Sequence, residues 1–479
     1  MPTRRQVLWA AGAIGAGVAT GCDTVPDGGK RSDDALLWWD HFQPREKFQK
    51  KLFDRFAQRK GGLPVEHTVF NPEKQGQALQ LAKSSDQLPD VFTLAGVRTP
   101  PVELAKKGWF SPLVLDQKSA AALPDDARYD GLTVFDDKLH SFPVNSPKEY
   151  HALVWFHRDL FAKAGLDPDA PPATYDEWRA GARAIRRQGG DGVSGWVLPL
   201  GFLERIGDQV ETLAQAAGAT AWQGRDFRTG EHVYHSEPYL QALEFLLAIK
   251  RDGTLFPASN SLDARKGRAR WATGAAGMFL DGCYCVGVVN TEFPTFDKDK
   301  LGVAPTPTPG REAPAIYRPP HAGTFWIANT SKHVEQATEL LSWFIGKEHQ
   351  TDIATSMASP PHLRSAVDAA KVHSTYRDAV GLFDDTVFVA PYPVVKNPAI
   401  APAVAAALDV KPGFAEVVQG VMAGDVTDHR KALRQLSDSL NAAQEKAMAQ
   451  LRKDGAANDE DIAFPDWTPR RDYGAASYR

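Results

Sequence analysis

The sequence predicts an α/β protein built around more than one hydrophobic core. Its 479 residues exceed the length that a single core usually supports, which favours two lobes or domains. Hydrophobic residues make up 43% of the chain and charged residues 24%, as is typical of globular proteins. From residue 34 onward, short apolar runs alternate with amphipathic segments. This order of strands and helices is typical of a mainly parallel sheet with helices on both faces.

The individual elements follow from the period of the apolar residues. Phe48, Leu52 and Phe56 recur at helical spacing, whereas residues 35–39 are continuously apolar, as in a buried strand. In the first part of the chain, strands are predicted at 35–39, 63–70 and 90–95, with helices at 44–60 and 73–84. Further strands are predicted at 152–156 and 276–279, with helices at 174–187, 208–217, 239–250, 334–345 and 428–453. The proline-rich stretch 304–320 is expected to connect elements, and residues 466–479 are expected to form an extended tail.

The N-terminus has the composition of an export signal. Arg4 and Arg5 precede an apolar run at 7–18, which is too short to cross a bilayer core of about 30 Å. The arginine pair and the residues around it are similar to the twin-arginine export signal. An ordinary secretion signal with a chance arginine pair is the alternative. Either signal would take the chain out of the cytoplasm.

The residues before Cys22 resemble a lipobox, in which the cysteine receives a lipid and becomes the N-terminus of the mature protein. Ala19 stands where leucine is usual, and a buried thiol is the alternative role for Cys22. The polar residues that follow suit a tether between a membrane surface and a folded domain. We therefore expect a signal peptide at 1–21, a lipid anchor at Cys22 on the outer face of the cell membrane, and a tether at 22–33.

Charge and cysteine content exclude several classes of protein. The formal net charge is −4 and becomes −6 once the two arginines at 4 and 5 are removed with the signal peptide, so nucleic acid is not expected as a partner. The three cysteines are too few for a disulfide scaffold and have no zinc-finger spacing. Cys283 and Cys285 are expected to be buried free thiols, with a redox pair as the alternative. No cofactor is implied.

Five segments in order resemble the extracellular solute-binding proteins of ATP-driven importers, in the carbohydrate-binding group that includes maltose-binding protein. Each segment alone is a weak signal, but their order and spacing match the family over most of residues 34–455. The segments are LPDVFTLAG with GWFSPL at 88–96 and 108–113, LVWFHRDLFAKAGLDPDAPPATYDEWRAGARAI at 153–185, GAAGMFLDGCY at 274–284, AGTFWIANTSKHVEQATELLSWFIG at 322–346, and the helical end at 428–453. Phe156 and His157 stand where the family usually has Tyr-Asn.

The resemblance implies a two-lobed periplasmic-binding-protein-like fold of type II, with a hinge between lobes that each hold a mainly parallel sheet flanked by helices. The first lobe would take residues 34–150 and 303–348, and the second 151–302 and 349–465. A carbohydrate, expected to be an oligosaccharide or glycoside, would bind between the lobes. The closed form would then dock on the permease subunits of an ABC transporter. The chain is expected to act as a monomer and not as an enzyme.

Two other functions stay open at this point. The first is an exported, lipid-anchored glycan hydrolase, which would need two carboxylates about 5–10 Å apart. No G-x-S-x-G or H-E-x-x-H motif is present in the sequence. The second keeps the fold but binds a polyamine, an iron chelate or a phosphodiester. A cationic ligand would need several carboxylates, whereas a phosphodiester would need helix N-termini and arginine.

Candidate ligand-binding residues in the first predicted lobe follow strands or enter the crossovers. A sugar needs flat aromatic rings and fixed hydrogen-bonding groups. Trp39, Asp40 and His41 follow the first strand, at the end where open α/β sheets bind ligands; the alternative is core packing, with Asp40 as a helix cap. Arg98 follows the third strand and is a candidate to contact the ligand; the alternative is a solvated charge on a loop. The remaining candidates on the first crossover are Phe142, Asn145 and Tyr150.

Further candidates come from the resemblance. In the family, the loop at Asp281 and Tyr284 places a polar residue and an aromatic platform in the cleft, and the turn after the apolar run is expected to expose Tyr284. The other candidates are Phe202 and Glu204, in the region of a second platform, Phe325 and Trp326, at the family's G-G-x-G-W position, and Tyr392. Strand alternation predicts that one of Phe325 and Trp326 faces the ligand and the other packs in the lobe.

Overall fold

The computed structural model describes residues 34–478. The predicted signal peptide, the lipidation site Cys22 and the tether lie outside the described residues. Within residues 34–478, no helix combines the length and apolar character that crossing a membrane requires. Two main sheets organise this part of the chain, one of five strands and one of four.

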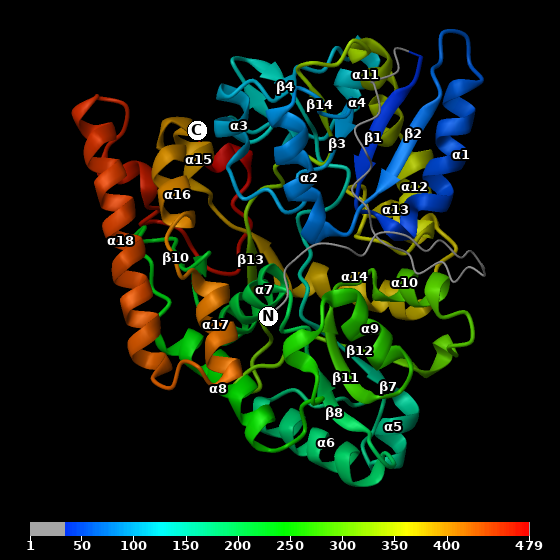
Figure 1. Cartoon of the computed structure of the whole chain (residues 1–479), viewed down its shortest axis with the longest axis vertical. Helices are drawn as coiled ribbons and strands as arrows, with labels where there is room; N and C mark the ends of the chain where they lie inside the picture. The colour runs from blue at the N-terminus through cyan, green and yellow to red at the C-terminus, as the bar shows by residue number, and fades with distance from the viewer. Residues whose placement is uncertain (1–33, 479) are drawn as a thin grey trace, which may run out of the picture. The chain divides into compact units, whose positions relative to one another are not determined.

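The first main sheet has the strand order β2-β1-β3-β14-β4 (Figure 1). β1 (Leu36–Asp40) lies parallel to β2 (Val65–Val69) and to β3 (Val91–Phe92). β14 (Trp326–Ala328) runs antiparallel to β3 and to β4 (Phe110–Ser111). Because β14 comes from a much later segment, the sheet is completed only when the chain returns to it.

Both faces of the first sheet are covered. Trp38 packs against Phe53 on one face, with ring centroids 5.0 Å apart, and Trp326 stacks on Phe110 on the other, at 4.3 Å. The helices of this region are α1 (Glu46–Ala57), α2 (Pro72–Ser84), α3 (Pro101–Lys106), α4 (Gln117–Ala122), α11 (Val334–Ser342) and α12 (Lys347–Thr355), and a small hairpin joins β5 (Val134–Phe135) to β6 (Lys138–Leu139). Aromatic side chains thus fill the core between the sheet and its helices.

The second main sheet has the order β12-β7-β11-β8 and is buried on both faces. β11 (Ala276–Asp281) is parallel to β8 (Ser194–Val197), whereas β7 (Leu153–His157) is antiparallel to β11 and to β12 (Leu301–Ala304). Its helices are α5 (Arg158–Lys163), α6 (Tyr175–Gln188), α7 (Leu203–Ala216), α8 (Glu237–Arg251), α9 (Ala264–Ala272), α10 (Cys285–Glu292), α13 (Ser365–Ala369) and α14 (Ser374–Thr386). A capping box of Thr174 and Glu177 starts α6.

The chain crosses between the two sheets more than once. β13 (Ile316–Arg318) pairs in parallel with β15 (Val387–Val389), and Asn145 forms an isolated bridge with Pro361. A second short hairpin joins β9 (Ala221–Trp222) to β10 (Arg225–Asp226). The β13–β15 pair and the Asn145–Pro361 bridge join segments far apart in the sequence, whereas the β9–β10 hairpin is local.

The C-terminal helices contact both halves. They are α15 (Pro393–Lys396), α16 (Ala401–Leu408), α17 (Phe414–Ala423) and the long α18 (His429–Lys453), which runs beside α16 and α17 (Figure 1). Leu436 of α18 joins the core around the second sheet, whereas Met448 of the same helix joins the core around the first, together with Val404 of α16. Parts of α12, α16 and α18 thus pack in the cores around the first sheet, although the sequence prediction placed all of 349–465 in the second lobe. The other lobe boundaries stay predictions.

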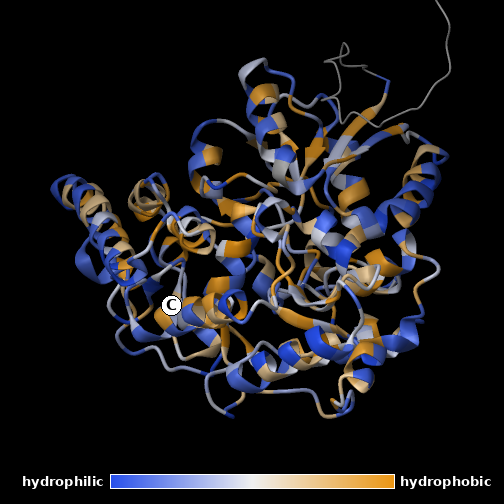
Figure 2. Cartoon of the chain, turned by 60° about the horizontal axis from the view of Figure 1, so that its bottom comes forward, coloured by the Kyte–Doolittle hydropathy of each residue, from blue (hydrophilic) through white to orange (hydrophobic). Residues whose placement is uncertain are grey.

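The predicted α/β class is confirmed, and Figure 2 shows hydrophobic residues gathered on the strands and on one side of many helices. Both main sheets mix parallel and antiparallel pairs, because one strand in each runs against its neighbours: β14 in the first sheet and β7 in the second. α7 begins at Leu203, before the predicted start at 208, and this earlier start shapes the site described below. The predicted extended tail at 466–479 instead packs Trp467 against Phe227 and Tyr317.

Candidate functional site

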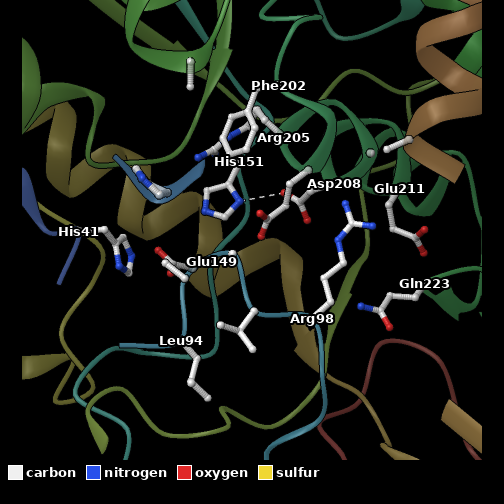
Figure 3. A pocket seen from close by; sticks show the side chains of 18 of the residues that line it. His41, Leu94, Arg98, Glu149, His151, Phe202, Arg205, Asp208, Glu211 and Gln223 are labelled. Atoms are coloured by element: carbon white, nitrogen blue, oxygen red, sulfur yellow. Dashed lines mark hydrogen bonds and ion pairs between the residues drawn. The ribbon is translucent and has the colours of Figure 1, made fainter. Parts of the chain in front are cut away.

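A cavity of about 700 Å³ lies between loops of the first sheet and helices of the second, and we call it the central cavity (Figure 3). The loops after β1 and β3 contribute 41–44 and 93–98, and the start of α7 contributes 202–211. Other walls come from the crossover segments, from the hairpin of β9 and β10, from α9 and from the region of α16 and α17. Pockets for small molecules typically measure about 300–1,000 Å³. The central cavity is therefore large enough for a small sugar or a solute of similar size.

Several residues predicted from the sequence meet in this cavity. Those that line it are His41, Arg98, Asn145, Phe202, Glu204 and Tyr284. They come from both sides of the chain's crossovers, and only the tertiary fold brings them together. The side chain of Arg98 extends from the loop after β3 toward the wall formed by α7 (Figure 3).

The structure assigns Asp40 a role different from the predicted one. Its carboxylate is fully buried and accepts hydrogen bonds from Trp38 Nε1 at 2.8 Å, Gln49 Nε2 at 2.9 Å and the backbone N–H of Phe42 at 2.9 Å. His67 Nε2 lies 3.0 Å from the same carboxylate. These four contacts hold the Asp40 carboxylate inside the first sheet's core, and Asp40 does not line the central cavity.

Most of the other predicted residues outside the lining are core side chains. Trp39 packs on Phe70 with ring centroids 4.9 Å apart, and Tyr150 on Phe383 at 4.8 Å. Phe142, Phe325 and Trp326 are at most 3% exposed, and Tyr392 is half-buried against the C-terminal segment, where its N–H donates to Tyr478 Oη. The expectation that either Phe325 or Trp326 faces the ligand is wrong for this structure, because both faces of β14 are covered by helices or neighbouring rings.

One face of α7 supplies polar groups that the sequence prediction missed. Arg205, Asp208 and Glu211 recur every third residue, so they share a face of the helix, and all three line the central cavity. The predicted start of this helix at 208 hid that pattern. Polar residues at helical spacing within a largely buried helix were the signal that could have shown it.

Asp208 is held by two partners. Its carboxylate lies 2.8 Å from His151 Nδ1 (Figure 3) and accepts a hydrogen bond of 3.3 Å from Arg318 Nη2. Burial alone would raise the pKa of Asp208, but the Arg318 guanidinium and His151 outweigh it and hold that pKa below its usual value. Asp208 is therefore an ionised carboxylate whose charge is already compensated within the protein.

Burial makes the ionised form of Glu211 and of Glu149 less favourable than that of an exposed glutamate. Burial raises the pKa of Glu211 to about 7, although Tyr239 Oη donates to its Oε1 at 2.6 Å. Burial also raises the pKa of Glu149, whose Oε2 has no hydrogen-bond partner among the described residues. At neutral pH Glu211 therefore carries less negative charge than an exposed glutamate, so it can donate as well as accept a hydrogen bond.

A cationic and aromatic corner surrounds Tyr284. Arg268 Nε donates to Asp281 Oδ2 at 2.6 Å, and Asp281 is only 1% exposed, so it stands behind the cavity wall rather than in it. Arg205 Nη1 is 4.0 Å from Asp281 Oδ1, and the guanidinium carbons of Arg205 and Arg268 lie 5.7 and 5.5 Å from the centre of the Tyr284 ring. Asp281 thus positions the arginines that meet the ligand space.

The cavity also offers aromatic rings and neutral imidazoles. Tyr234 stacks on Phe414 with centroids 4.1 Å apart, and Arg318 covers one side of Trp222. Burial lowers the pKa of both His41 and His321 to about 4, so both rings are uncharged at neutral pH. Flat rings, neutral donors and charged groups therefore occur together in one cavity.

Metal or thiol chemistry has no support in the described residues. No group of His, Cys, Asp and Glu within 34–478 could hold a metal ion. Cys283 and Cys285, on either side of Tyr284, are buried free thiols, and burial raises the pKa of each. Uncharged buried thiols are poor nucleophiles. The two cysteines pack the turn that carries Tyr284.

Solved structures of similar fold are ABC-transporter solute-binding proteins. One from Thermotoga lettingae TMO bound with alpha-D-tagatose has a TM-score of 0.65 at 18% identity, covering 86% of this chain and 100% of that one. Maltose-bound MalE3 of T. maritima has a TM-score of 0.64 at 18% identity, and the match covers 85% of this chain and 98% of that one. The Listeria monocytogenes protein Lmo0181 in complex with cycloalternan has a TM-score of 0.63 at 17% identity, and the match covers 86% of this chain and 99% of that one. At these identities the likeness shows the fold alone.

Curated relatives match a shorter part of the chain. The sn-glycerol-3-phosphate-binding periplasmic proteins UgpB of Brucella abortus (strain 2308) and Brucella suis biovar 1 (strain 1330) are 25% identical over 140 residues. The match spans 27% of this chain and only 29% of the length of those relatives. The profile of the family "Bacterial extracellular solute-binding protein" matches residues 40–351, most of the described chain. By that match, this chain belongs to the bacterial extracellular solute-binding protein family.

Proposed function

We propose that this protein is the extracytoplasmic substrate-binding component of an ABC-type sugar importer, which captures a carbohydrate in the central cavity and delivers it to the permease. The observation that carries the proposal is the cavity itself, about 700 Å³ in volume and lined by both aromatic rings and hydrogen-bonding groups. A sugar needs both, because its C–H faces are apolar and its rim carries hydroxyls.

Tyr284 is the ring best placed to contact a sugar. It lies on the turn between β11 and α10, and its side chain is half-buried. A sugar could stack on the part of this ring that faces the central cavity. His151, whose ring centre lies 5.9 Å from that of Tyr284, stands beside this space and adds a polar group.

The comparisons support a carbohydrate as the ligand class. Proteins of similar fold were solved with alpha-D-tagatose, maltose, raffinose and cycloalternan. These ligands differ in size and linkage, so they support the class and not one sugar. The family consists of binding proteins, and we propose capture and release without turnover rather than hydrolysis of a glycan.

Delivery follows from the two-part architecture. The cavity walls come from segments on both sides of the crossovers, so bending at these crossovers would close the walls around a bound sugar. The closed form would then dock on the permease as a monomer. We further propose export by the twin-arginine route and anchoring through a lipid on Cys22, which suit a protein that works at the outer face of the membrane.

Isothermal titration calorimetry of the purified protein against mono- and oligosaccharides tests the proposal. We expect saturable binding with no new sugar product. Replacing Tyr284 by alanine should weaken that binding about tenfold, the equivalent of about 1.4 kcal/mol, through loss of the stacked ring. Tyr284→Phe, which keeps the ring, should retain most of the affinity. Cleavage of the titrated sugar, or unchanged affinity in Tyr284→Ala, would contradict the proposal.

A further inference from the structure

One wall of the central cavity is a short hairpin that has little stability of its own. β9 (Ala221–Trp222) and β10 (Arg225–Asp226) are two residues long each, and a hairpin of this size is marginally stable in isolation. Trp222, Gln223 and Arg225 line the cavity, and Figure 3 shows the Gln223 side chain extending into it. A ligand that touches this wall therefore depends on whatever holds the hairpin in place.

The turn of this hairpin also needs support. Gln223 has a φ of 51° and Gly224 a φ of 71°, so both central residues are left-handed, as in the type I′ turn that suits a two-residue hairpin loop. Glycine adopts this conformation freely, whereas a residue with a Cβ keeps it only where the surrounding structure enforces it. Gln223 is thus a strained residue that also presents its exposed side chain to the cavity.

The C-terminal segment grips the end of the hairpin. We call residues 464–473 the strap. The backbone N–H of Phe464 donates to the carbonyl of Phe227 at 2.8 Å, and Arg228 Nε donates to the carbonyl of Trp467 at 3.1 Å. The centre of the Trp467 ring lies 4.7 Å from that of Phe227. Phe227 directly follows β10, so these contacts hold the outgoing end of the hairpin.

The same rings stand behind the cavity wall. Trp467 also packs on Tyr317 of β13, with ring centres 5.1 Å apart. Trp467, Tyr317 and Phe227 belong to one hydrophobic cluster, and Trp222 packs against it. Trp222, a residue of the wall, therefore rests on a cluster that the strap completes.

The strap is itself anchored on the crossover segments. The backbone N–H of Tyr473 donates to the carbonyl of Val389 at 2.8 Å, and the N–H of Val389 donates to Asp472 Oδ1 at 2.8 Å. Lys148 Nζ, on the first crossover, lies 2.7 Å from Asp472 Oδ2. Val389 is the last residue of β15. The strap thus ties the hairpin to segments that join the two halves of the chain.

The other supports of the hairpin act at different points. Gln215 Nε2 of α7 donates to the carbonyl of Ala221 at 2.7 Å, which holds the start of β9. Arg225 Nε donates to Gln444 Oε1 of α18 at 2.9 Å, which holds a side chain. Neither contact reaches Phe227, whose ring meets those of Trp467 and Tyr317. The outgoing end of the hairpin is therefore held mainly by the strap and by β13.

We propose that the strap positions the β9–β10 hairpin for ligand binding, with Trp467 as its main positioning residue. A wall that is already ordered binds a ligand more tightly than one that must become ordered on binding, because no further conformational entropy is lost. Removing the Trp467 ring should therefore weaken binding, although Trp467 does not line the central cavity. The inference rests on the proposed function, since it assigns a residue outside the cavity to the capture of the same ligand.

Hydrogen exchange of the ligand-free protein tests the positioning directly. In Trp467→Ala we expect exchange at the backbone amides of 222–226 to be about tenfold faster, because the hairpin would open locally more often. Trp467→Phe keeps a ring against Phe227 and should restore most of the protection. The matched control for lost stability is Asp40→Ala, because Asp40 is buried in the first sheet's core and does not line the cavity. Its exchange at 222–226 should equal that of the native protein.

Calorimetry with glucose, maltose and raffinose as probes measures the consequence for binding. The sugar that the native protein binds most tightly should bind Trp467→Ala about tenfold more weakly, whereas Trp467→Phe and Asp40→Ala should stay within about twofold of the native affinity.

A milder variant keeps the test valid should Trp467→Ala fail to fold. Arg228→Ala removes the hydrogen bond to the Trp467 carbonyl from an exposed position, and should weaken binding about threefold with faster exchange at 222–226. Its matched control is Arg471→Ala, at an exposed position of the same strap, which should change neither quantity.

The outcomes separate this inference from the proposed function. Native exchange at 222–226 in Trp467→Ala, or faster exchange with unchanged affinity, would overturn the inference and leave sugar capture standing. An equal loss of affinity in Asp40→Ala would also overturn it, because lost stability alone would then explain the effect. The same holds if Arg228→Ala and Arg471→Ala behave alike in both measurements. Binding of none of the three sugars by the native protein would overturn the proposed function, and the inference with it, whatever the exchange data show.

Discussion

Replacing Asp40 by alanine should destabilise the fold without weakening the ligand site. The Asp40 carboxylate accepts from Trp38 Nε1, Gln49 Nε2 and the backbone N–H of Phe42 within 2.9 Å, and it lies 3.0 Å from His67. Each of the three N–H donors is buried in the core around the first sheet. Alanine would leave them unpaired and would also leave a small cavity.

The magnitude follows from the number of donors left unpaired. A buried group without its hydrogen-bond partner loses about 1–3 kcal/mol, and removing a buried charged partner typically loses about 3–5 kcal/mol. We therefore expect the free energy of unfolding to fall by about 4 kcal/mol. With an unfolding entropy of about 2.1 cal/mol/K per residue, a chain of this length would lose about 4 °C in Tm. Ligand affinity should stay within about twofold, because Asp40 does not line the central cavity.

The effect should depend on pH in a defined direction. Burial alone would raise the pKa of Asp40, but the hydrogen bond and charge of His67 outweigh it and place that pKa below the usual value. The ionised carboxylate thus stabilises the fold above about pH 4, and this contribution is lost as the pH falls through the folded-state pKa. The difference between the native protein and Asp40→Ala should shrink below about pH 4.

Urea unfolding and calorimetry on the same samples would measure stability and affinity. Asp438→Ala, on the exposed side of α18, is the control and should change neither quantity. An Asp40→Ala variant with unchanged stability and lost sugar binding would refute the structural role described above. It would instead place Asp40 in the binding site, as the sequence alone predicts.

Two further predictions concern Trp467 and Glu211. Trp467→Ala should lower the free energy of unfolding by about 3 kcal/mol, because the centre of this buried ring lies 4.7 Å from that of Phe227 and 5.1 Å from that of Tyr317. Urea unfolding would measure the loss, with Arg471→Ala at an exposed position as the control. A loss below about 1 kcal/mol would show that the C-terminal segment is dispensable for stability. Burial raises the pKa of Glu211 to about 7, so between about pH 4.5 and pH 7 the folded state keeps a proton that the unfolded chain releases, and the free energy of unfolding falls as the pH rises. Glu211→Gln should remove this part of the decrease, which urea titrations at pH 5, 6 and 7 would measure. The same dependence of the unfolding free energy on pH in both proteins would contradict the prediction.

The local elements could be predicted well from the sequence because their signals are local. The apolar run at 276–279 lies within β11, and the capping box of Thr174 and Glu177 starts α6 one residue after the predicted position. α7 was predicted to begin too late, because Phe202 caps it without a side-chain hydrogen bond and no capping motif marks the start. Glu204 on its first turn was a candidate, but Arg205, Asp208 and Glu211 were not recognised as one face of this helix.

The candidate site was only partly predictable, since position after a strand does not say where a side chain points. His41 and Asp40 are neighbours after β1, yet His41 lines the central cavity and Asp40 is buried. Phe325 and Trp326 belong to a motif that places a ring near the ligand in related proteins, but helices and rings cover both faces of β14 here. Only the packing of distant segments decides such cases.

The sequence by itself determined the α/β class, the order of most elements and the family, because periodicity and motif order are carried along the chain. The tertiary structure decided how the chain interleaves, since β14 and α18 reach cores formed by residues far away in sequence. It also decided the character of the cavity. Arg205, Arg268 and Tyr284 come from three separate elements, and their shared environment depends on burial and on the Asp281 carboxylate that lies beside both arginines.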